Sequence, residues 1–89
     1  MTGPVRRKRG VAHRQVEGQT VIVLAQAHEA MVLNTTGSRI WELSDGQKDV
    51  REIAAALAER FDLAVDQAVE DVTRFYAEMI AAGTMEAAS

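Results

Sequence analysis

The chain has 89 residues, of which 47% are hydrophobic and 26% charged, the composition of a single globular domain rather than of a disordered or coiled-coil chain. It contains no cysteine, which excludes disulfide frameworks, thiol nucleophiles and thiolate zinc sites and fits a cytoplasmic protein. The longest apolar run, residues 21–25, is far shorter than the roughly 20 residues of a membrane span, and no signal-peptide pattern is present, so we expect a soluble protein that is not exported.

The formal net charge of −3 hides a basic N-terminus. Residues 1–14 hold five basic side chains and no acidic one, which leaves a net charge of −8 for the rest of the chain. Basic termini are commonly solvated tails, and they also contact nucleic acid or acidic peptides. We expect residues 1–10 to form a flexible basic arm, and the charge alone does not choose between these roles.

Three stretches with strand-like patterns follow the arm. Residues 11–16 and 20–25 are rich in β-branched side chains, and Gly18 between them suits a tight hairpin turn. After a short polar break at residues 26–29, residues 30–33 form a third apolar run of strand length. This pattern predicts a three-stranded antiparallel meander.

Two helices are expected next. Residues 35–38 supply capping side chains for a short first helix, which ends before the break at Asp45-Gly46. Asp49 and Glu52 have the spacing of a capping box at the start of the second helix. Large apolar side chains at helical spacing are assigned to the core, namely Ile40, Trp41, Ile53, Leu57 and Phe61.

The third helix is expected to begin at a cap formed by Asp66 and to end near Gly83. At about 100° per residue its apolar side chains spread over an arc of roughly 140°. Either the whole stripe packs on the sheet and the other helices, or part of it lines a groove. The stripe consists of Ala68, Val69, Val72, Phe75, Tyr76, Met79 and Ile80.

The order of elements predicts an α+β domain over residues 11–85, with a frayed tail over residues 86–89. A three-stranded antiparallel sheet followed by three helices is winged helix-turn-helix-like, which makes a DNA-binding regulator the alternative function. The third helix argues against it, because four acidic side chains and one basic one would repel phosphates. We therefore do not expect nucleic acid to be the partner.

Side chains with catalytic or ligand-binding chemistry are few. The two histidines, His13 and His28, are expected in a strand and a turn, and their spacing matches neither a nucleophile–base pair nor a metal site. Gly37 and Gly46 are isolated and form no phosphate-binding loop. We expect a protein without catalytic residues, metal or cofactor, and not an enzyme.

Several short motifs occur in a fixed order over residues 20–85. They are Met31-Val32-Leu33-Asn34 with Thr36-Gly37, Ile40-Trp41-Glu42-Leu43, Asp45-Gly46, Val50 and Ile53, Leu57 and Phe61, Asp71-Val72, Phe75, Met79 and Gly83. Together they resemble the PqqD-like peptide chaperones, also called RiPP recognition elements. In that family a strand ending in Leu-Asn precedes a short helix, a D-G turn, a V-x-x-I helix and a D-V-x-x-F helix. Thr84-Met85 departs from the family's more aliphatic pair.

The resemblance implies a non-catalytic module that binds the leader segment of a ribosomally synthesised precursor peptide by strand addition to the third strand. It also implies delivery of the peptide to a modifying enzyme, either a radical SAM protein, as for pyrroloquinoline quinone, or a leader protease, as for lasso peptides. An edge strand has the unpaired backbone groups that strand addition needs. The same edge could pair two copies of the chain, so we expect a monomer or weak dimer.

In the family the leader lies between the third strand and the third helix. The residues implied as its contacts here are Ala30, Met31, Val32, Leu33, Asn34, Asp71, Val72, Arg74, Phe75, Tyr76 and Met79. The strand residues would contribute mainly backbone, and the charged pair Asp71 and Arg74 would lie at the rim. The apolar helix residues are candidate pocket walls, about half of which we expect to belong to the core.

Overall fold

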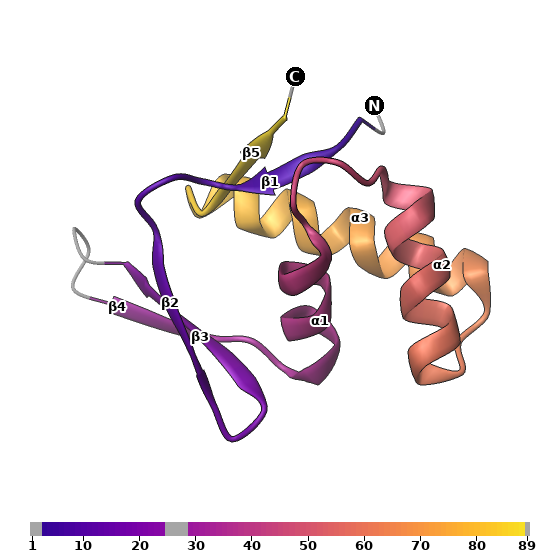
Figure 1. Ribbon diagram of the computed structural model, residues 1–89, viewed down its shortest axis with the longest axis horizontal. Coiled ribbons are helices and arrows are strands. Elements are labelled where there is room, and N and C mark those ends of the chain that lie inside the picture. The colour runs from indigo at the N-terminus through magenta and orange to yellow at the C-terminus, as the bar shows by residue number, and fades with distance from the viewer. Residues whose placement is uncertain (1–2, 25–28, 89) are drawn as a thin grey trace.

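The protein is described by a computed structural model that covers residues 3–24 and 29–88 (Figure 1). A three-stranded antiparallel sheet has the order β2-β3-β4, and a second sheet pairs β1 with β5. In chain order the elements are β1 (Val5–Arg7), β2 (Ala12–Val16), β3 (Gln19–Leu24), β4 (Glu29–Val32), α1 (Thr35–Leu43), α2 (Val50–Phe61), α3 (Val65–Ala81) and β5 (Met85–Ala87). The predicted α+β class, with three helices after a three-stranded antiparallel sheet, is confirmed.

The expected hairpin joins β2 to β3 through a two-residue turn. Glu17 and Gly18 both have positive φ, 51° and 82°, as a type I′ turn requires. The register pairs Val16 with Gln19 and continues to Ala12 and Val23. One face of β3 is therefore directed to the core, where Thr20 and Ile22 are fully buried.

Helix α1 is capped by Asn34 rather than by the residues from 35 to 38. The Asn34 side chain accepts the Gly37 N–H at 2.7 Å. Ser38, expected to cap, instead ties α1 to the sheet, because its Oγ accepts the Thr20 N–H at 2.8 Å and donates to the Leu33 carbonyl oxygen at 3.3 Å. This hydroxyl completes the end of the β3–β4 ladder and fixes where α1 leaves the sheet.

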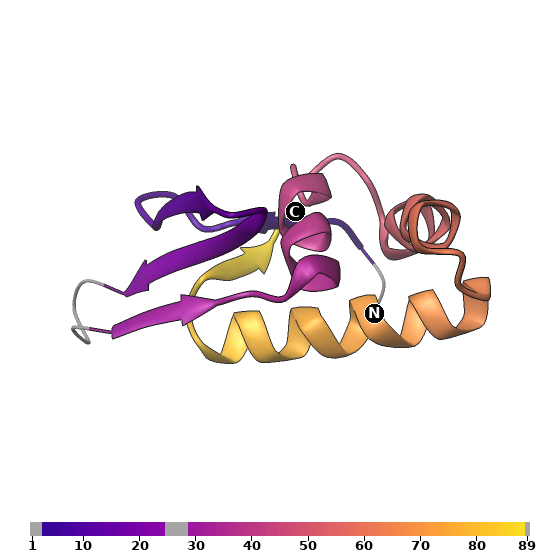
Figure 2. The same ribbon diagram turned by 90° about the horizontal axis from the view of Figure 1, so that it is seen from below.

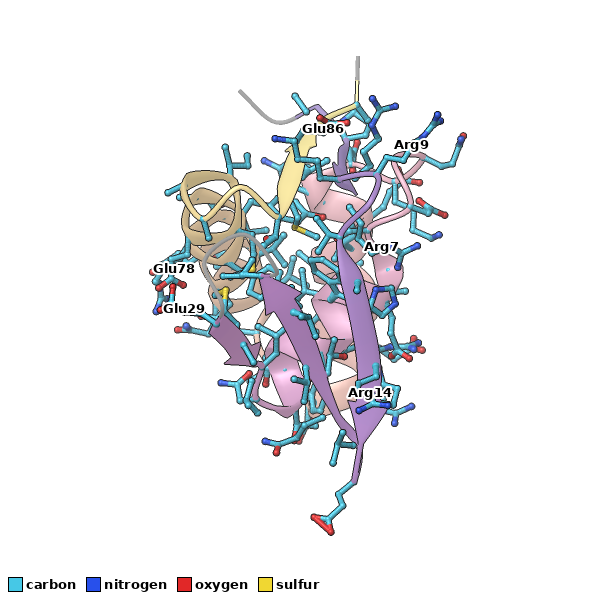
Figure 3. The ribbon with its side chains drawn as sticks, turned by 90° about the vertical axis from the view of Figure 1, so that its left-hand side faces the viewer. Arg7, Arg9, Arg14, Glu29, Glu78 and Glu86 are labelled. Atoms are coloured by element: carbon cyan, nitrogen blue, oxygen red, sulfur yellow. The ribbon has the colours of Figure 1, made fainter. Side chains whose placement is uncertain are left out.

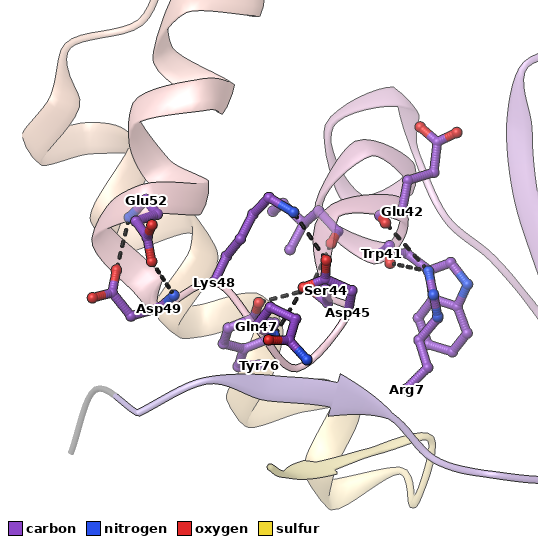
Figure 4. Close-up of polar contacts among 11 residues, drawn as sticks. Arg7, Trp41, Glu42, Ser44, Asp45, Gln47, Lys48, Asp49, Glu52 and Tyr76 are labelled. Atoms are coloured by element: carbon purple, nitrogen blue, oxygen red, sulfur yellow. Dashed lines mark hydrogen bonds and ion pairs between the residues drawn. The ribbon is translucent and has the colours of Figure 1, made fainter.

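The predicted capping box at the start of α2 is confirmed (Figure 4). The Glu52 N–H donates to Asp49 Oδ1 at 2.9 Å, and the Asp49 N–H donates to Glu52 Oε1 at 3.0 Å. In the preceding turn the Gln47 N–H donates to Asp45 at 2.9 Å, and together with the Lys48 ammonium it lowers the pKa of that carboxyl. Both devices lie at the connection between α1 and α2 and order its backbone.

The start of α3 differs from the expectation. Its N-cap is Ala64, without a side-chain hydrogen bond, and Asp66 lies inside the first turn, where it complements the positive end of the helix dipole. The predicted end is confirmed, since Gly83 has φ 80°. The N–H groups of Gly83 and Thr84 donate back to the Ile80 and Met79 carbonyl oxygens, both at 3.0 Å, which is a Schellman motif.

Two short strands, at residues 5–7 and 85–87, pair with each other close to the two ends of the chain. β1 pairs with β5 in the register Val5↔Ala87 and Arg7↔Met85. The Lys8 N–H extends this ribbon by donating to the Thr84 carbonyl oxygen at 2.9 Å. The backbone groups of two short segments, distant in the sequence, satisfy each other, so these residues are strands.

The core lies between the inner face of the sheet and the three helices (Figure 2). Four of the five predicted core side chains are confirmed as buried, and Trp41 is the largest of them. Phe61 is only partly buried and packs against the outside of the core, because it lies in the last turn of α2. No helix of the described residues is long and apolar enough to cross a membrane.

Candidate functional site

β4 is an edge strand of the three-stranded sheet. It pairs with β3 on one side, and no described strand pairs with its other side. The Leu33 N–H donates to the Thr20 carbonyl oxygen at 2.8 Å, which fixes the phase of the ladder. Because inward and outward backbone groups alternate along an antiparallel strand, Ala30 and Val32 direct their N–H and C=O groups to the open side.

The side chains at this edge divide between core and solvent. Leu33 is 6% exposed and belongs to the core, and Met31 is partly buried against it. Val32 is 64% exposed, the most exposed large apolar side chain of the described residues. β4 is thus anchored from one face while its backbone edge stays accessible.

The C-terminal half of α3 lies beside β4, as Figure 2 shows from below. A cavity of about 250 Å³ separates the two elements. It is lined by Met31, Val32, Leu33, Asn34, Gly37, Phe75, Glu78 and Met79. The apolar side chains give it a floor that suits an apolar side chain of a ligand.

A second cavity, of about 240 Å³, continues the first toward the N-terminus of α1. Its lining residues are Asn34, Thr36, Gly37, Ile40, Asp71, Arg74, Phe75 and Glu78. Both cavities share Asn34, Gly37, Phe75 and Glu78, so they form one continuous depression. We call the residues lining these two cavities the β4–α3 groove.

Gly37 sets the depth of the groove where the two cavities meet. A Cβ at this position would lie 3.1 Å from Asn34 Oδ1 and 3.1 Å from Phe75 Cε1. Both distances are shorter than ordinary van der Waals contact, so a methyl group here would have to push the Asn34 amide or the Phe75 ring away by a few tenths of an ångström. Gly37 was part of the family motif but was not predicted as a site residue.

The rim of the groove is mainly acidic. Arg74 Nη2 and Asp71 Oδ1 form an exposed ion pair at 3.0 Å, and Gln67 also donates to Asp71 at 3.0 Å. Glu78 lines both cavities, and Glu29 lies on the same side of the sheet in Figure 3. An exposed pair such as Asp71–Arg74 contributes only about 0–1 kcal/mol to stability, so its side chains are available to a ligand.

The four apolar α3 residues implied as pocket walls are all buried in the core, and only Phe75 and Met79 among them also line the β4–α3 groove. Val72 is fully buried, and Tyr76 is 5% exposed. The Tyr76 hydroxyl is 2.7 Å from Ser44 Oγ, which in turn donates to the Ile40 carbonyl oxygen at 2.6 Å (Figure 4). Because the single hydrogen of the Ser44 hydroxyl is donated to the Ile40 carbonyl oxygen, the Tyr76 hydroxyl is the donor to Ser44 Oγ. Burial raises the pKa of Tyr76. Neither Val72 nor Tyr76 lines the β4–α3 groove.

The remaining implied residues lie at or beside the groove. Those from Met31 to Asn34 and Asp71, Arg74, Phe75 and Met79 line it, and Ala30 lies on the open edge. Sequence reasoning missed Thr36, Gly37, Ile40 and Glu78. Glu78 could have been found, because it lies one helical turn after Phe75 and so shares its face.

His13 takes no part in the groove. His13 contacts the edge of the Trp41 ring with centroids 5.4 Å apart. His28 lies outside the described residues. Among the residues that the structure covers, no group of three or more His, Cys, Asp or Glu side chains is arranged to hold a metal ion.

Comparison with protein families gives a match to coenzyme PQQ synthesis protein D (PqqD) over residues 19–84. This segment runs from the start of β3 to the end of the α3 cap and contains the whole β4–α3 groove. The chain belongs to the PqqD family. The matched segment excludes β1, β2 and β5.

A curated relative of this PqqD-family chain is the PqqA binding protein of Rhizobium meliloti (strain 1021). The two are 36% identical over 64 residues, which cover 72% of this chain and 63% of the relative. The chain therefore spans less than two thirds of that protein's length.

Two solved structures share the fold of this PqqD-family chain. TbiB1, in complex with the TbiA(beta) leader peptide, matches with a TM-score of 0.81 and 21% identity over 91% of this chain and 94% of TbiB1. The PqqD truncation of Methylobacterium extorquens PqqCD, a stand-alone RiPP recognition element, matches with a TM-score of 0.77 and 23% identity, over 92% of this chain and 87% of that one. At these identities the matches establish the architecture of strands and helices.

Proposed function

We propose that this chain binds the leader segment of a ribosomally synthesised precursor peptide as a strand added to β4 in the β4–α3 groove. The observation that carries the proposal is the open backbone edge of β4 facing the groove wall on α3. The names of the relatives support it, because one is called a PqqA binding protein and another was solved with a leader peptide.

Main-chain hydrogen bonds would supply much of the affinity. Ala30 and Val32 each direct one N–H and one C=O to the open side of β4, and an extended peptide alongside can pair with both residues. Such bonds do not depend on the side chains of the peptide. They hold the peptide alongside β4, and the side chains that enter the groove fix its register.

Side-chain recognition would come from the cavity beside the strand. Successive side chains of an added strand point to opposite faces, so every second leader residue would face Phe75 and Met79. The thioether of Met79 adapts to different apolar shapes, and the acidic rim at Glu78 favours a neutral or basic neighbour. The leader suited to this groove has an apolar side chain at every second position and neutral or basic side chains near Glu78.

The proposed role is non-catalytic delivery. The bound peptide would be presented to a modifying enzyme, a radical SAM protein in pyrroloquinoline quinone biosynthesis or a leader protease in lasso-peptide biosynthesis. Precursor peptides are made by ribosomes, which supports a cytoplasmic site of action. The charge of α3 disfavours DNA binding, because this helix holds four acidic side chains and one basic one and lines an acidic groove.

The test is a titration of the labelled protein with a synthetic leader from the precursor encoded beside it, followed by amide NMR shifts. We expect saturable shifts concentrated at residues 30–34 and 71–79. The shifts at Ala30 and Val32 should be among the largest, because their N–H groups acquire new acceptors. Unchanged spectra of the folded protein would contradict leader binding for that peptide.

A further inference from the structure

A strongly basic surface lies on the other side of the sheet from the acidic groove. In Figure 3, Glu29 and Glu78 lie on one side, and Arg7, Arg9 and Arg14 lie on the other. With the neighbouring Arg6 these arginines form what we call the cationic face. All four precede residue 19, so they lie outside the segment that matches the PqqD family.

The fold holds the cationic face in place. β1 pairs with β5, so Arg6 and Arg7 are strand residues rather than parts of a loose tail. Arg7 Nη1 donates to the Trp41 and Glu42 carbonyl oxygens at 2.9 and 3.3 Å, where α1 ends. The backbone of Arg14 is held by its pairing with Val21 in the sheet. The backbone beneath the cationic face is therefore ordered before a partner binds.

The carboxylates nearby are already paired. Glu86 bonds Arg6 at 2.9 Å, and Asp45 bonds Lys48 at 3.0 Å. Glu42 pairs with Arg39 at 3.4 Å. Among the described residues neither Arg9 nor Arg14 forms an ion pair. The positive charge of Arg9 and Arg14 is therefore not neutralised within this part of the chain.

A cavity of about 290 Å³ opens on this face. Arg6, Arg7 and Arg9 line it together with Ser44, Asp45 and Glu86. Arg6 is paired with Glu86 and Arg7 with backbone carbonyl groups, so Arg9 is the lining guanidinium left to bind a projecting carboxylate through paired hydrogen bonds. The mixture of cations with paired acids fits a protein surface better than the continuous negative charge of a phosphate backbone.

We infer that the cationic face docks an acidic surface of the modifying enzyme that receives the leader, an inference that rests on the proposed function. Because the β4–α3 groove lies on the other side of the sheet, docking through the cationic face leaves the bound peptide accessible. Leader binding and enzyme binding then use separate residues. The acidic groove and the basic docking face also orient the domain, since an acidic partner is attracted to one side and repelled from the other.

The test compares two double charge reversals in the full chain. Arg9→Glu with Arg14→Glu alters the cationic face, and Arg51→Glu with Arg60→Glu makes the same change in net charge on exposed positions of α2. The probe is the purified modifying enzyme encoded beside this protein. We expect the first variant to weaken enzyme binding about tenfold or more and to reduce its salt dependence, and the second to change binding less than about twofold.

The leader titration is measured on the same two variants. It should change less than about twofold in both, since neither alters the β4–α3 groove. Loss of enzyme binding to an equal degree in both variants, or in neither, would overturn docking through the cationic face. Binding of a 20-base-pair DNA duplex (about two helical turns) that depends on Arg9 and Arg14, without enzyme binding, would assign the face to nucleic acid. Absence of leader binding in the unaltered protein would instead contradict the proposed function.

Discussion

The depth of the groove depends on single residues, and Gly37 is a position where even a methyl group would meet close neighbours. A methyl group at this position would lie 3.1 Å from Asn34 Oδ1 and from Phe75 Cε1, so at least one of these side chains would have to move. We expect Gly37→Ala to lower the free energy of unfolding by about 1 kcal/mol, because the contacts and the weakened Asn34 cap outweigh the higher helix propensity of alanine. Leader affinity should fall as Phe75 is displaced. Chemical denaturation and the leader titration measure both effects.

The matched control is Thr36→Ala, one position earlier on the same cavity wall. It removes only a partly exposed hydroxyl, so both stability and leader affinity should stay nearly unchanged. If Gly37→Ala proved as stable as the unaltered protein and bound the leader equally well, Phe75 would have room to move and Gly37 would not set the depth of the groove.

Tyr76 is a core residue whose ionisation can be followed directly, because it is the single tyrosine of the chain. Its pKa is raised above 10.0 by burial, so the folded state favours the neutral phenol. This contribution to stability is complete below pH 10 and is lost as the pH rises through the folded pKa. Tyrosinate absorbance should therefore appear at higher pH in the folded protein than in denaturant.

Tyr76→Phe tests the same hydroxyl by removal. It should cost about 1 kcal/mol at neutral pH through the lost hydrogen bond to Ser44 and should leave leader affinity unchanged. A large loss of leader affinity with normal stability would instead indicate that Tyr76 contacts the leader, as the family resemblance implies.

The sequence alone could only partly distinguish the α3 residues that line the groove from those that belong to the core alone. Phe75, Tyr76 and Met79 lie on one arc of α3, and periodicity cannot say which end of an arc meets α1 and which meets β4. The angle between α3 and the sheet decides this, and it depends on contacts distant in the sequence. Glu78 was missed for a related reason, since a charge on a helix is ordinarily assigned to solvent.

Among the elements, β4 carries the clearest prediction. Val32→Pro removes an N–H that faces the open edge and places a ring where an added strand would lie, whereas the ladder to β3 uses its neighbours. We expect leader affinity to fall about tenfold or more, with the fold retained. Val32→Thr keeps the N–H and changes only the side chain, so it should bind nearly as well.

Met31→Pro provides a contrast at the adjacent position. Its N–H faces β3, so the substitution should unfold the edge of the sheet and lower the melting temperature. Circular dichroism distinguishes the two outcomes. Equal leader binding by Val32→Pro and the unaltered protein would contradict strand addition at this edge.

Elements with local signals were predictable from the sequence. The β2–β3 turn has Gly18 at its centre, α2 begins with the Asp49–Glu52 box, and Gly83 ends α3, each within a few residues of the element that it bounds. β1 and β5 have no such signal. Each has three residues, and each is a strand only because the other lies beside it.

At the scale of the whole molecule, the β1–β5 ribbon supports the core as well as the cationic face. Val5 is 8% exposed, and Arg7 is bonded to the end of α1. We expect removal of residues 1–8 to lower the free energy of unfolding by at least about 2 kcal/mol through lost burial and hydrogen bonds. Thermal unfolding measures this change. An unchanged unfolding temperature would indicate that these residues form a flexible arm, as expected from the sequence.

The pairing of β1 with β5 also makes the domain suitable for insertion into another protein. Its first and last strands lie side by side, so the two points at which a longer polypeptide would enter and leave are adjacent (Figure 1). Domains with neighbouring ends can be inserted into a surface loop of a host protein with little distortion of either partner. Such an insertion would leave β4 and α3 uncovered. If the host were the modifying enzyme, the two proteins would be joined covalently and would not have to meet by diffusion.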